Sequence, residues 1–229
     1  MQYVALATDY DGTLATDGRV DEATLAALER LRESGRRLIL VTGRHLEDLL
    51  ETFPQINLFD HVVLENGALL YRPATREEKA LGDRPPEAFV KALQERGVAP
   101  LAVGRVIVAT WHPHETTVLE VIRELGLELQ VIFNKGAVMV LPSGLNKASG
   151  LKAALDELGL SPSHTVGVGD AENDHAFLDL CECSVAVANA LPLLKERVDL
   201  VTTGVRGAGV TELIDRIIAS DLSELEPQT

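Results

Sequence analysis

Short segments that are apolar at nearly every position recur along this chain, separated by longer segments whose apolar residues have helical spacing. Clear examples of the short segments are 3–7, 38–41 and 165–168. A strand that is apolar at consecutive positions is buried on both faces, as in parallel sheets covered by helices. The alternation therefore predicts an α/β fold built on a doubly wound, mostly parallel sheet.

Helix and turn signals add detail to this prediction. Leu25, Leu28 and Leu31 form one stripe of a helix expected over 21–34, and Gly35 would end it. Asn66-Gly67 is a hairpin signal between two short apolar runs. The other elements expected here are strands over 61–64, 68–71, 184–188 and 199–202, a helix after Arg44, helices over 147–158 and 210–219, and a frayed tail over 224–229.

The pattern changes in the middle of the chain. A polar stretch over 72–86 contains Pro85-Pro86 and has the composition of a linker. After it we expect helices over 87–96 and 115–125, and strands over 105–110, 128–133 and 137–141. The last two strands flank the turn Asn134-Lys135-Gly136. We therefore predict a core domain from residues 1–80 and 144–229, with a small α/β domain inserted over 81–143.

Composition excludes several classes of partner. The 229 residues carry a formal net charge of −14 and no Lys/Arg cluster, whereas nucleic-acid binding requires a basic face. No apolar run approaches the roughly 18 residues of a membrane helix, and the N-terminus lacks the basic flank of a signal peptide. Cys181 and Cys183 are too close for an unstrained disulfide. We expect a protein of the cytoplasm with reduced cysteines, no nucleic-acid partner and no membrane association.

Polar clusters occur where the predicted strands of the core end. Asp9 and Asp11 follow the first strand, Thr42-Gly43 follows the second, and Gly169-Asp170-Ala171-Glu172-Asn173-Asp174 follows the strand over 165–168. Lys147 opens a helix after the insert. Ligands of open α/β sheets bind at the carboxyl ends of the strands, so these segments are expected to meet at one rim.

The chemistry of these side chains indicates a metal and a phosphate. Carboxylates crowded together repel one another unless a cation lies among them, and hard oxygen ligands favour Mg²⁺. A lysine and a threonine at helix N-termini can hold phosphate oxygens, and a carboxylate can attack phosphorus. An Asp-x-Asp pair alone also occurs at turns and helix caps. The ordered set of clusters is therefore the stronger indication of a phosphoryl-transfer site.

These residues resemble the motifs of the haloacid dehalogenase superfamily of phosphatases. Asp9-Tyr10-Asp11-Gly12-Thr13 is similar to its first motif, Val41-Thr42-Gly43-Arg44 to its second, Lys147 to its third, and the segment 169–174 to its fourth. Glu65-Asn66-Gly67 and Asn189-Ala190 look like the Cof-like subgroup, which carries an α/β cap between the second and third motifs. The resemblance implies a Rossmann-like core, with the insert as the cap, and covers nearly the whole chain.

The resemblance also implies a role for each motif residue. Asp9 would be the nucleophile and a Mg²⁺ ligand, and Asp11 would be the general acid and base, with its backbone carbonyl facing the metal. Thr42, Gly43, Lys147 and Asn173 would bind the phosphoryl group of the substrate, with Thr42 and Lys147 taking part in catalysis. Asp170 and Asp174 would complete the metal site.

The expected activity is Mg²⁺-dependent hydrolysis of a small phosphate monoester, such as a sugar phosphate or phosphoglycolate, by a monomer or homodimer. A phosphotransferase or phosphomutase with the same aspartyl-phosphate remains the alternative, because these motifs do not determine whether water or a sugar hydroxyl accepts the phosphoryl group. A signalling receiver domain also places acids, a threonine and a lysine around Mg²⁺, but it is much shorter and has no insert. The motifs do not identify the substrate.

Four residues of the cap have two interpretations. Trp111, His112 and His114 follow a predicted cap strand and either face the leaving group or pack within the cap. Lys135, in the turn of the cap hairpin, either pairs with a substrate carboxylate or lies in solvent.

Overall fold

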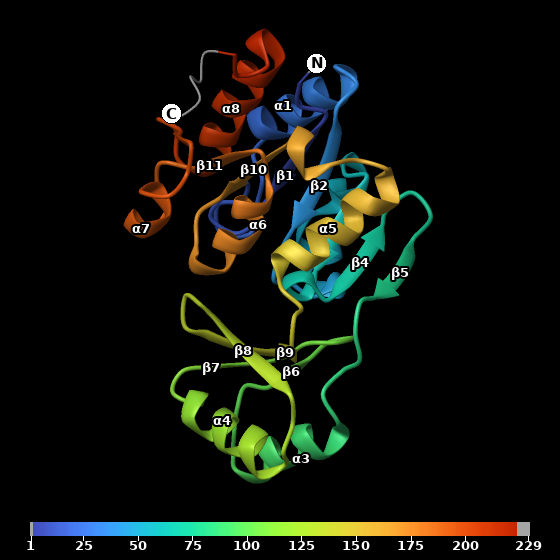
Figure 1. The fold of residues 1–229 in the computed structure, drawn as a ribbon, viewed down its shortest axis with the longest axis vertical. Coiled ribbons are helices and arrows are strands. Elements are labelled where there is room, and N and C mark those ends of the chain that lie inside the picture. The colour runs from blue at the N-terminus through green and yellow to red at the C-terminus, as the bar shows by residue number, and fades with distance from the viewer. Residues whose placement is uncertain (1, 224–229) are drawn as a thin grey trace.

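The structure is a computed structural model that describes residues 2–223, and it consists of a larger part that carries both ends of the chain and a smaller part formed by its middle (Figure 1). The tail expected over 224–229 lies outside the described residues. Within the described part, no helix is long and apolar enough to cross a membrane.

The larger part is built on an eight-stranded sheet with the order β12-β11-β10-β1-β2-β3-β4-β5. Neighbouring strands are parallel from β12 to β3, and β4 and β5 are added as antiparallel strands. This arrangement confirms the predicted mostly parallel α/β sheet. The strands are β1 Ala5–Thr8, β2 Arg37–Val41, β3 His61–Leu64, β4 Leu69–Arg72, β5 Glu77–Ala80, β10 Thr165–Gly169, β11 Cys183–Ala186 and β12 Leu200–Val201.

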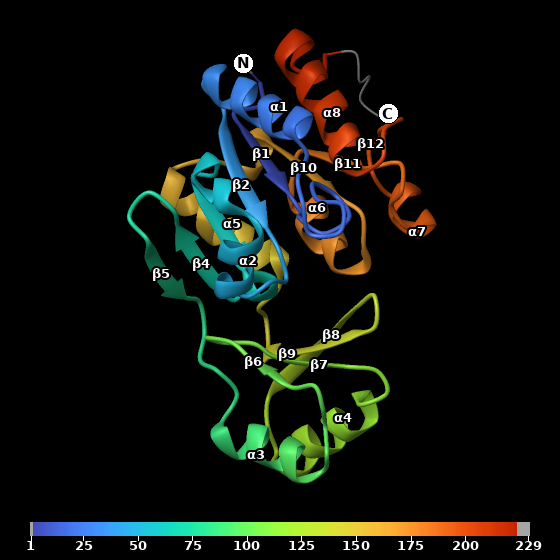
Figure 2. The ribbon, with the colours of Figure 1, turned by 180° about the vertical axis from the view of Figure 1, so that it is seen from behind.

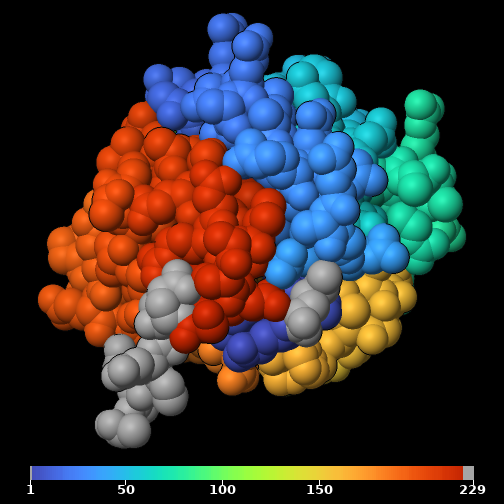
Figure 3. Space-filling view, turned by 90° about the horizontal axis from the view of Figure 1, so that it is seen from above, coloured from blue at the N-terminus to red at the C-terminus, as the bar shows by residue number. Residues whose placement is uncertain are grey.

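Helices cover both faces of this sheet. α5 and α6 lie on one face, and α1 and α8 lie on the other (Figures 1 and 2). α8 packs beside α1, although these two helices come from opposite ends of the chain (Figure 3). The helices of this part are α1 Glu22–Glu33, α2 Leu46–Thr52, α5 Lys147–Leu158, α6 His175–Leu180, α7 Pro192–Lys195 and α8 Arg206–Ser220, with short 3₁₀ segments η1 Pro54–Leu58, η2 Glu65–Gly67, η3 Pro162–His164 and η4 Glu172–Asp174.

Local chemistry explains where the best-predicted helices begin and end. At the start of α1, the Asp21 carboxylate accepts a hydrogen bond of 2.7 Å from the backbone N–H of Thr24, a cap that contributes about 1 kcal/mol to helix stability. The buried stripe of α1 includes Leu28 and Leu31, and the chain leaves this helix through Gly35 at φ +87°. At the start of α5, Asn146 and Ser149 form a reciprocal capping box. This cap fixes Lys147 as the first helical residue.

The smaller part, here called the cap, is a four-stranded antiparallel sheet with the order β6-β7-β9-β8. Two helices lie on the face of this sheet that is turned away from the core, so its other face looks toward the core (Figures 1 and 2). The elements of the cap are α3 Glu87–Glu95, β6 Ala102–Val103, β7 Val108–Trp111, α4 Glu115–Glu124, β8 Leu129–Asn134 and β9 Ala137–Pro142.

The cap strand β6 is not among the expected strands, α8 begins at Arg206 instead of residue 210, and two further segments differ from the prediction for a clear physical reason. Glu77–Ala80, expected as linker, forms the exposed edge strand β5, which pairs with β4 through its backbone and has no apolar alternation to reveal it. The cap strand expected from residue 105 begins only at Val108. The backbone N–H groups of residues 105–107 are directed instead to the Glu65 carboxylate of the core, at 2.8, 2.8 and 2.9 Å.

Candidate active site

The carboxyl ends of β10, β1 and β2 lie side by side in the sheet order. The chain leaves β1 toward β2 on one side and leaves β10 toward β11 on the other. Such a switch point opens a crevice at the strand ends, where ligands of α/β sheets bind. Asp9, Thr42 and Asp170 each come directly after one of these three strands.

Lys147 joins the segments across this crevice. Its Nζ lies 2.6 Å from Asp9 Oδ1 and 2.6 Å from Asp174 Oδ1, and all three side chains are buried. The other oxygen of Asp174 accepts hydrogen bonds from the backbone N–H groups of Asp170 and Ala171, at 2.8 and 2.9 Å. Asp174 is therefore held in one orientation by the loop that carries Asp170.

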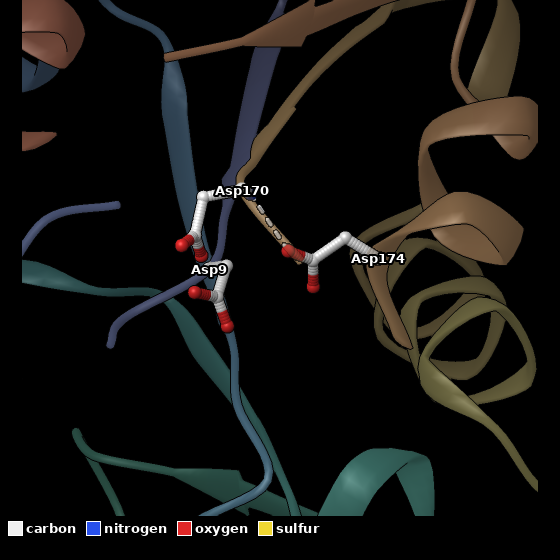
Figure 4. A group of neighbouring side chains, drawn as sticks. All are labelled: Asp9, Asp170 and Asp174. Carbon is white, nitrogen blue, oxygen red and sulfur yellow. Dashed lines mark hydrogen bonds between the residues drawn. The ribbon is translucent and has the colours of Figure 1, made fainter. Parts of the chain in front are cut away.

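Three carboxylates converge at this point. Asp9, Asp170 and Asp174 each offer an oxygen, and these oxygens lie within 4.8 Å of one another (Figure 4). One of the two Asp170 oxygens, Oδ2, is 2.8 Å from the ammonium of Lys135, which reaches the site from the cap hairpin. Thr13 donates to the remaining oxygen of Asp170 at 3.2 Å.

The electrostatics of the site call for an additional cation. Burial raises the pKa of Asp9, as do Asp174 and Asp170, while Lys147 opposes the rise, and the result is a pKa of about 7. Burial lowers the pKa of Lys147, but the attraction of Asp174 and Asp9 outweighs it, so this pKa is also raised. The pKa of Asp9 thus rises mainly because the carboxyl is buried, and the pKa of Lys147 rises because its ammonium lies between two carboxylates. A hard oxygen set with excess negative charge fits Mg²⁺.

Asp11 has a different environment from the other three acids. Both of its carboxylate oxygens pair with Arg44, at 2.7 Å to Nε and 2.8 Å to the terminal nitrogen. Its backbone carbonyl, in contrast, faces the carboxylate cluster and lies 3.2 Å from the ammonium of Lys135. Of the two groups of Asp11, therefore, the carbonyl is the one positioned toward the predicted metal site.

The remaining predicted substrate ligands surround the same crevice. Thr42 is buried, and its hydroxyl accepts a hydrogen bond from the backbone N–H of Arg44 at 3.2 Å, at the turn that leads into α2. Asn173 donates to Asn66 Oδ1 at 2.9 Å. Asn66 Nδ2 and Asn173 Oδ1 are buried without a partner among residues 2–223, so this amide pair retains one donor and one acceptor.

A cavity of about 210 Å³ lies between the cap sheet and the β2–α2 turn. Gly43 and His45 line it from the core, and Trp111 and Met139 line it from the cap. His112 instead pairs with Glu115 at 2.8 Å, and His114 lies 3.1 Å from the Ala99 carbonyl. Of the aromatic cluster on the cap, only Trp111 lines this cavity.

A larger cavity, of about 650 Å³, occurs at the amino end of β3. Arg32, His61 and Arg72 are among its lining residues, and none of the predicted site residues lines it. By volume alone this cavity would be the candidate active site, but the buried charged residues lie at the opposite edge of the sheet, at the carboxyl ends of the strands. We assign the candidate active site to the charged crevice.

Several residues of the crevice have roles that their sequence positions do not reveal. Arg44 belongs to the second motif but pairs with Asp11 of the first, and Asn66 of the turn before the cap accepts a hydrogen bond from Asn173 of the fourth motif. These contacts join positions far apart in the chain. Thr13, in contrast, belongs to the first motif itself, and its contact with Asp170 could have been suspected from that position.

Comparison with known proteins agrees with this geometry. A family model described as haloacid dehalogenase-like hydrolase matches residues 6–105 and 123–214. The phosphoglycolate phosphatase of Methanothermobacter thermautotrophicus is 32% identical over 226 residues, which cover 93% of this chain and 98% of that protein.

Solved structures share the fold over the core and the cap together. A haloacid dehalogenase-like hydrolase from Bacteroides thetaiotaomicron has a TM-score of 0.78 at 20% identity, covering 94% of this chain and 99% of that one. The sucrose-phosphatase from Synechocystis has a TM-score of 0.71 at 21% identity, covering 94% and 98%. With the family match and the archaeal relative, these likenesses show that the chain belongs to the haloacid dehalogenase superfamily of phosphatases.

Proposed function

We propose that this phosphatase hydrolyses a small phosphate monoester with Mg²⁺ through a covalent phosphate on Asp9. The observation that carries the proposal is the shared ammonium of Lys147, which holds Asp9 and Asp174 at 2.6 Å each beside the third acid, Asp170. Asp9, Asp170, Asp174 and the carbonyl of Asp11 would hold the Mg²⁺. The ion supplies the charge neutralisation that phosphoryl transfer requires.

In the first step, an oxygen of Asp9 attacks phosphorus, and the bond from phosphorus to the leaving oxygen breaks. Asp11 gives its proton to that oxygen, so the leaving group departs as an alcohol instead of an alkoxide. Lys147 and Thr42 hold the phosphoryl oxygens as negative charge spreads over them. Arg44 fixes the orientation of Asp11 through its two contacts with the carboxylate.

In the second step, water attacks the phosphorus of the acyl phosphate. Asp11, now a carboxylate, takes a proton from this water, and the bond to Asp9 breaks to release inorganic phosphate. Asp9 returns as a carboxylate and Asp11 as an acid, so the enzyme is restored. The same aspartyl-phosphate could pass to a sugar hydroxyl, which makes the phosphotransferase an outcome of the test below.

The names of the relatives support a small phosphate ester as the substrate. The Methanothermobacter thermautotrophicus protein is named a phosphoglycolate phosphatase, and one structural relative is a sugar phosphatase of subclass IIB. Both kinds of substrate are phosphate monoesters of small molecules. The cytoplasmic location and the monomeric or dimeric state stay predictions, although both cysteines are free and buried, as expected for a reducing compartment.

Phosphate release from a panel of phosphate esters tests the proposal. We expect release with Mg²⁺ and no added acceptor, complete loss in EDTA, and recovery when Mg²⁺ is restored. Unchanged rates in EDTA would refute the metal-dependent mechanism. Release that requires a sugar acceptor would identify a phosphotransferase instead.

A further inference from the structure

Lys135 is the one residue of the cap, among residues 2–223, that hydrogen-bonds to the proposed catalytic and metal-binding residues. Its Nζ lies 2.8 Å from Asp170 Oδ2 and 3.2 Å from the carbonyl oxygen of Asp11. The first distance is that of an ion pair between the cap and the fourth motif. The cap therefore places a positive charge at the edge of the phosphoryl-transfer site.

The backbone around Lys135 is unusual for a lysine. The register pairs Asn134 with Ala137, which leaves Lys135 and Gly136 as the two turn residues, with φ +48° and +89°. Two-residue hairpin turns of this kind favour Asn, Asp or Gly, because other side chains crowd the backbone at positive φ. A lysine held there points to a use for its ammonium, since such strain concentrates at functional sites.

The present partner of Lys135 is also a proposed metal ligand. An ammonium and a divalent cation repel each other when they share one carboxylate. The side chain of Lys135 is 46% exposed and has four flexible bonds, so its charge can leave Asp170 without any movement of the hairpin. Once the metal site is filled, the ammonium is available to pair with another anion on the cap side of the crevice.

The adjoining cavity offers little to a neutral polyhydroxylated leaving group. It measures about 210 Å³ and is lined mainly by small or apolar residues, namely Gly43, Pro100, Ala102, Ala109, Ala137 and Met139. The Thr110 hydroxyl in its wall already donates to the Pro100 carbonyl at 2.7 Å, and His45 faces Glu65 at 3.6 Å. Sugar hydroxyls would find few free partners there, whereas a short leaving group fits.

We propose that Lys135 is the specificity-determining residue of the cap, and that its ammonium binds a carboxylate on the leaving group. The enzyme then favours small phosphate esters that carry a carboxylate over neutral sugar phosphates. This inference rests on the proposed phosphatase function. That proposal left sugar phosphates and phosphoglycolate open as substrates, and the inference favours the second. It requires no displacement of the cap from the position described here.

The test compares two esters of similar size, phosphoglycolate and 2-hydroxyethyl phosphate, with saturating Mg²⁺. We expect the wild type to prefer phosphoglycolate. In Lys135→Gln the ratio of the two kcat/KM values falls about tenfold to a hundredfold, chiefly through the KM for phosphoglycolate, because a charged hydrogen bond is lost. Lys135→Arg retains much of the preference. The control Lys91→Gln removes an exposed lysine of the cap helix α3 and leaves the ratio unchanged.

Binding of the product gives a second readout. Trp111 is the sole tryptophan and is half-exposed beside the hairpin, so its fluorescence reports ligands in this cavity. With Mg²⁺ and inorganic phosphate present, glycolate changes the fluorescence of the wild type at lower concentration than that of Lys135→Gln.

Two results would overturn the inference: an unchanged ratio of the two kcat/KM values in Lys135→Gln, or a wild type that prefers neutral sugar phosphates. The absence of phosphate release from every ester by the wild type is a different result, because it refutes the proposed function itself.

Discussion

Three buried carboxylates and one buried ammonium meet within the space of a few side chains. Asp9, Asp174 and Lys147 are 5%, 0% and 1% exposed. Charges buried to this degree destabilise the folded state unless they are paired, so the local excess of acid is stable only beside a cation. The same excess of negative charge fits the proposed Mg²⁺ site.

Metal binding should therefore depend on pH through Asp9, whose pKa is raised to about 7. Its folded pKa lies above the unfolded one, so the metal-free protein loses stability as the pH rises toward 7. Mg²⁺ binds the ionised form and releases the proton. We expect the Mg²⁺ affinity to rise about tenfold per pH unit between roughly pH 5 and 7 and to level off above.

Calorimetric titration of the EDTA-treated protein at several pH values measures this dependence. Asp9→Asn provides the control, because the amide has no proton to release and the step near pH 7 should disappear. Equal Mg²⁺ affinity at pH 6 and pH 8 in the wild type would contradict the assignment of Asp9.

At the scale of elements, the short segment η2 connects the catalytic rim to the cap. Glu65 and Asn66 both have positive φ, +51° and +56°, which turns the Glu65 carboxylate toward the cap and Asn66 toward Asn173. Glu65 is buried, and its oxygens accept the N–H groups of residues 105–107. The η2 turn therefore contacts both Asn173, a proposed phosphate ligand, and residues 105–107 of the cap.

Glu65→Gln should weaken this connection in a pH-dependent way. Burial raises the pKa of Glu65, but hydrogen bonds from His45 and from the backbone of Ile107, Val106 and Arg105 lower it more, so the net shift is downward. Such a carboxylate stabilises the fold above its unfolded pKa, and this contribution is lost as the pH falls through the folded value. We expect Glu65→Gln to cost about 1–3 kcal/mol at pH 7.

Urea unfolding at pH 7 and below about pH 4 checks the sign, because the difference between Glu65→Gln and the wild type should shrink in acid. Glu29→Gln, on the exposed face of α1, is the matched control and should change little. A difference that grows in acid would contradict the role given to the ionised Glu65.

The strongest elements could be predicted from the sequence because caps and periodic apolar residues define them locally. The helix expected over 147–158 is α5, and that expected over 21–34 differs from α1 only at its ends. β5 could not be predicted, because an exposed strand of Glu-Glu-Lys-Ala has no alternation of buried and exposed residues. The motifs likewise pointed to Asp9, Asp170 and Asp174, whereas the contacts of Lys135 and Arg44 depend on tertiary structure that local patterns do not encode.

At the scale of the whole molecule, the turn η2, whose Glu65 carboxylate binds the backbone of the cap, packs against the start of α5 at the catalytic rim. Gly67, at φ +103°, lies so near α5 that a Cβ there would be 1.8 Å from the carbonyl oxygen of Asn146. A side chain at residue 67 would therefore displace the start of α5, and with it Lys147. The attachment of the cap and the position of the catalytic ammonium are set by the same close contact.

In the proposed mechanism, the core holds the phosphoryl group at fixed charges, and the cap contacts the rest of the substrate. The formal net charge of −14 does not oppose an anionic substrate, because Lys147, Lys135 and Arg44 supply positive charge at the crevice, while distant charges are screened within about 8 Å at physiological salt. The proposed mechanism depends on covalent chemistry at Asp9.

Rapid acid quenching of the enzyme with a phosphate ester labelled on phosphorus, followed by peptide mass spectrometry, tests that chemistry most directly. We predict labelled phosphate on Asp9 in the wild type. In Asp9→Asn we predict no labelled peptide and no phosphate release, with an unchanged far-UV circular dichroism spectrum. A label on another residue, or appreciable turnover by Asp9→Asn, would contradict the account.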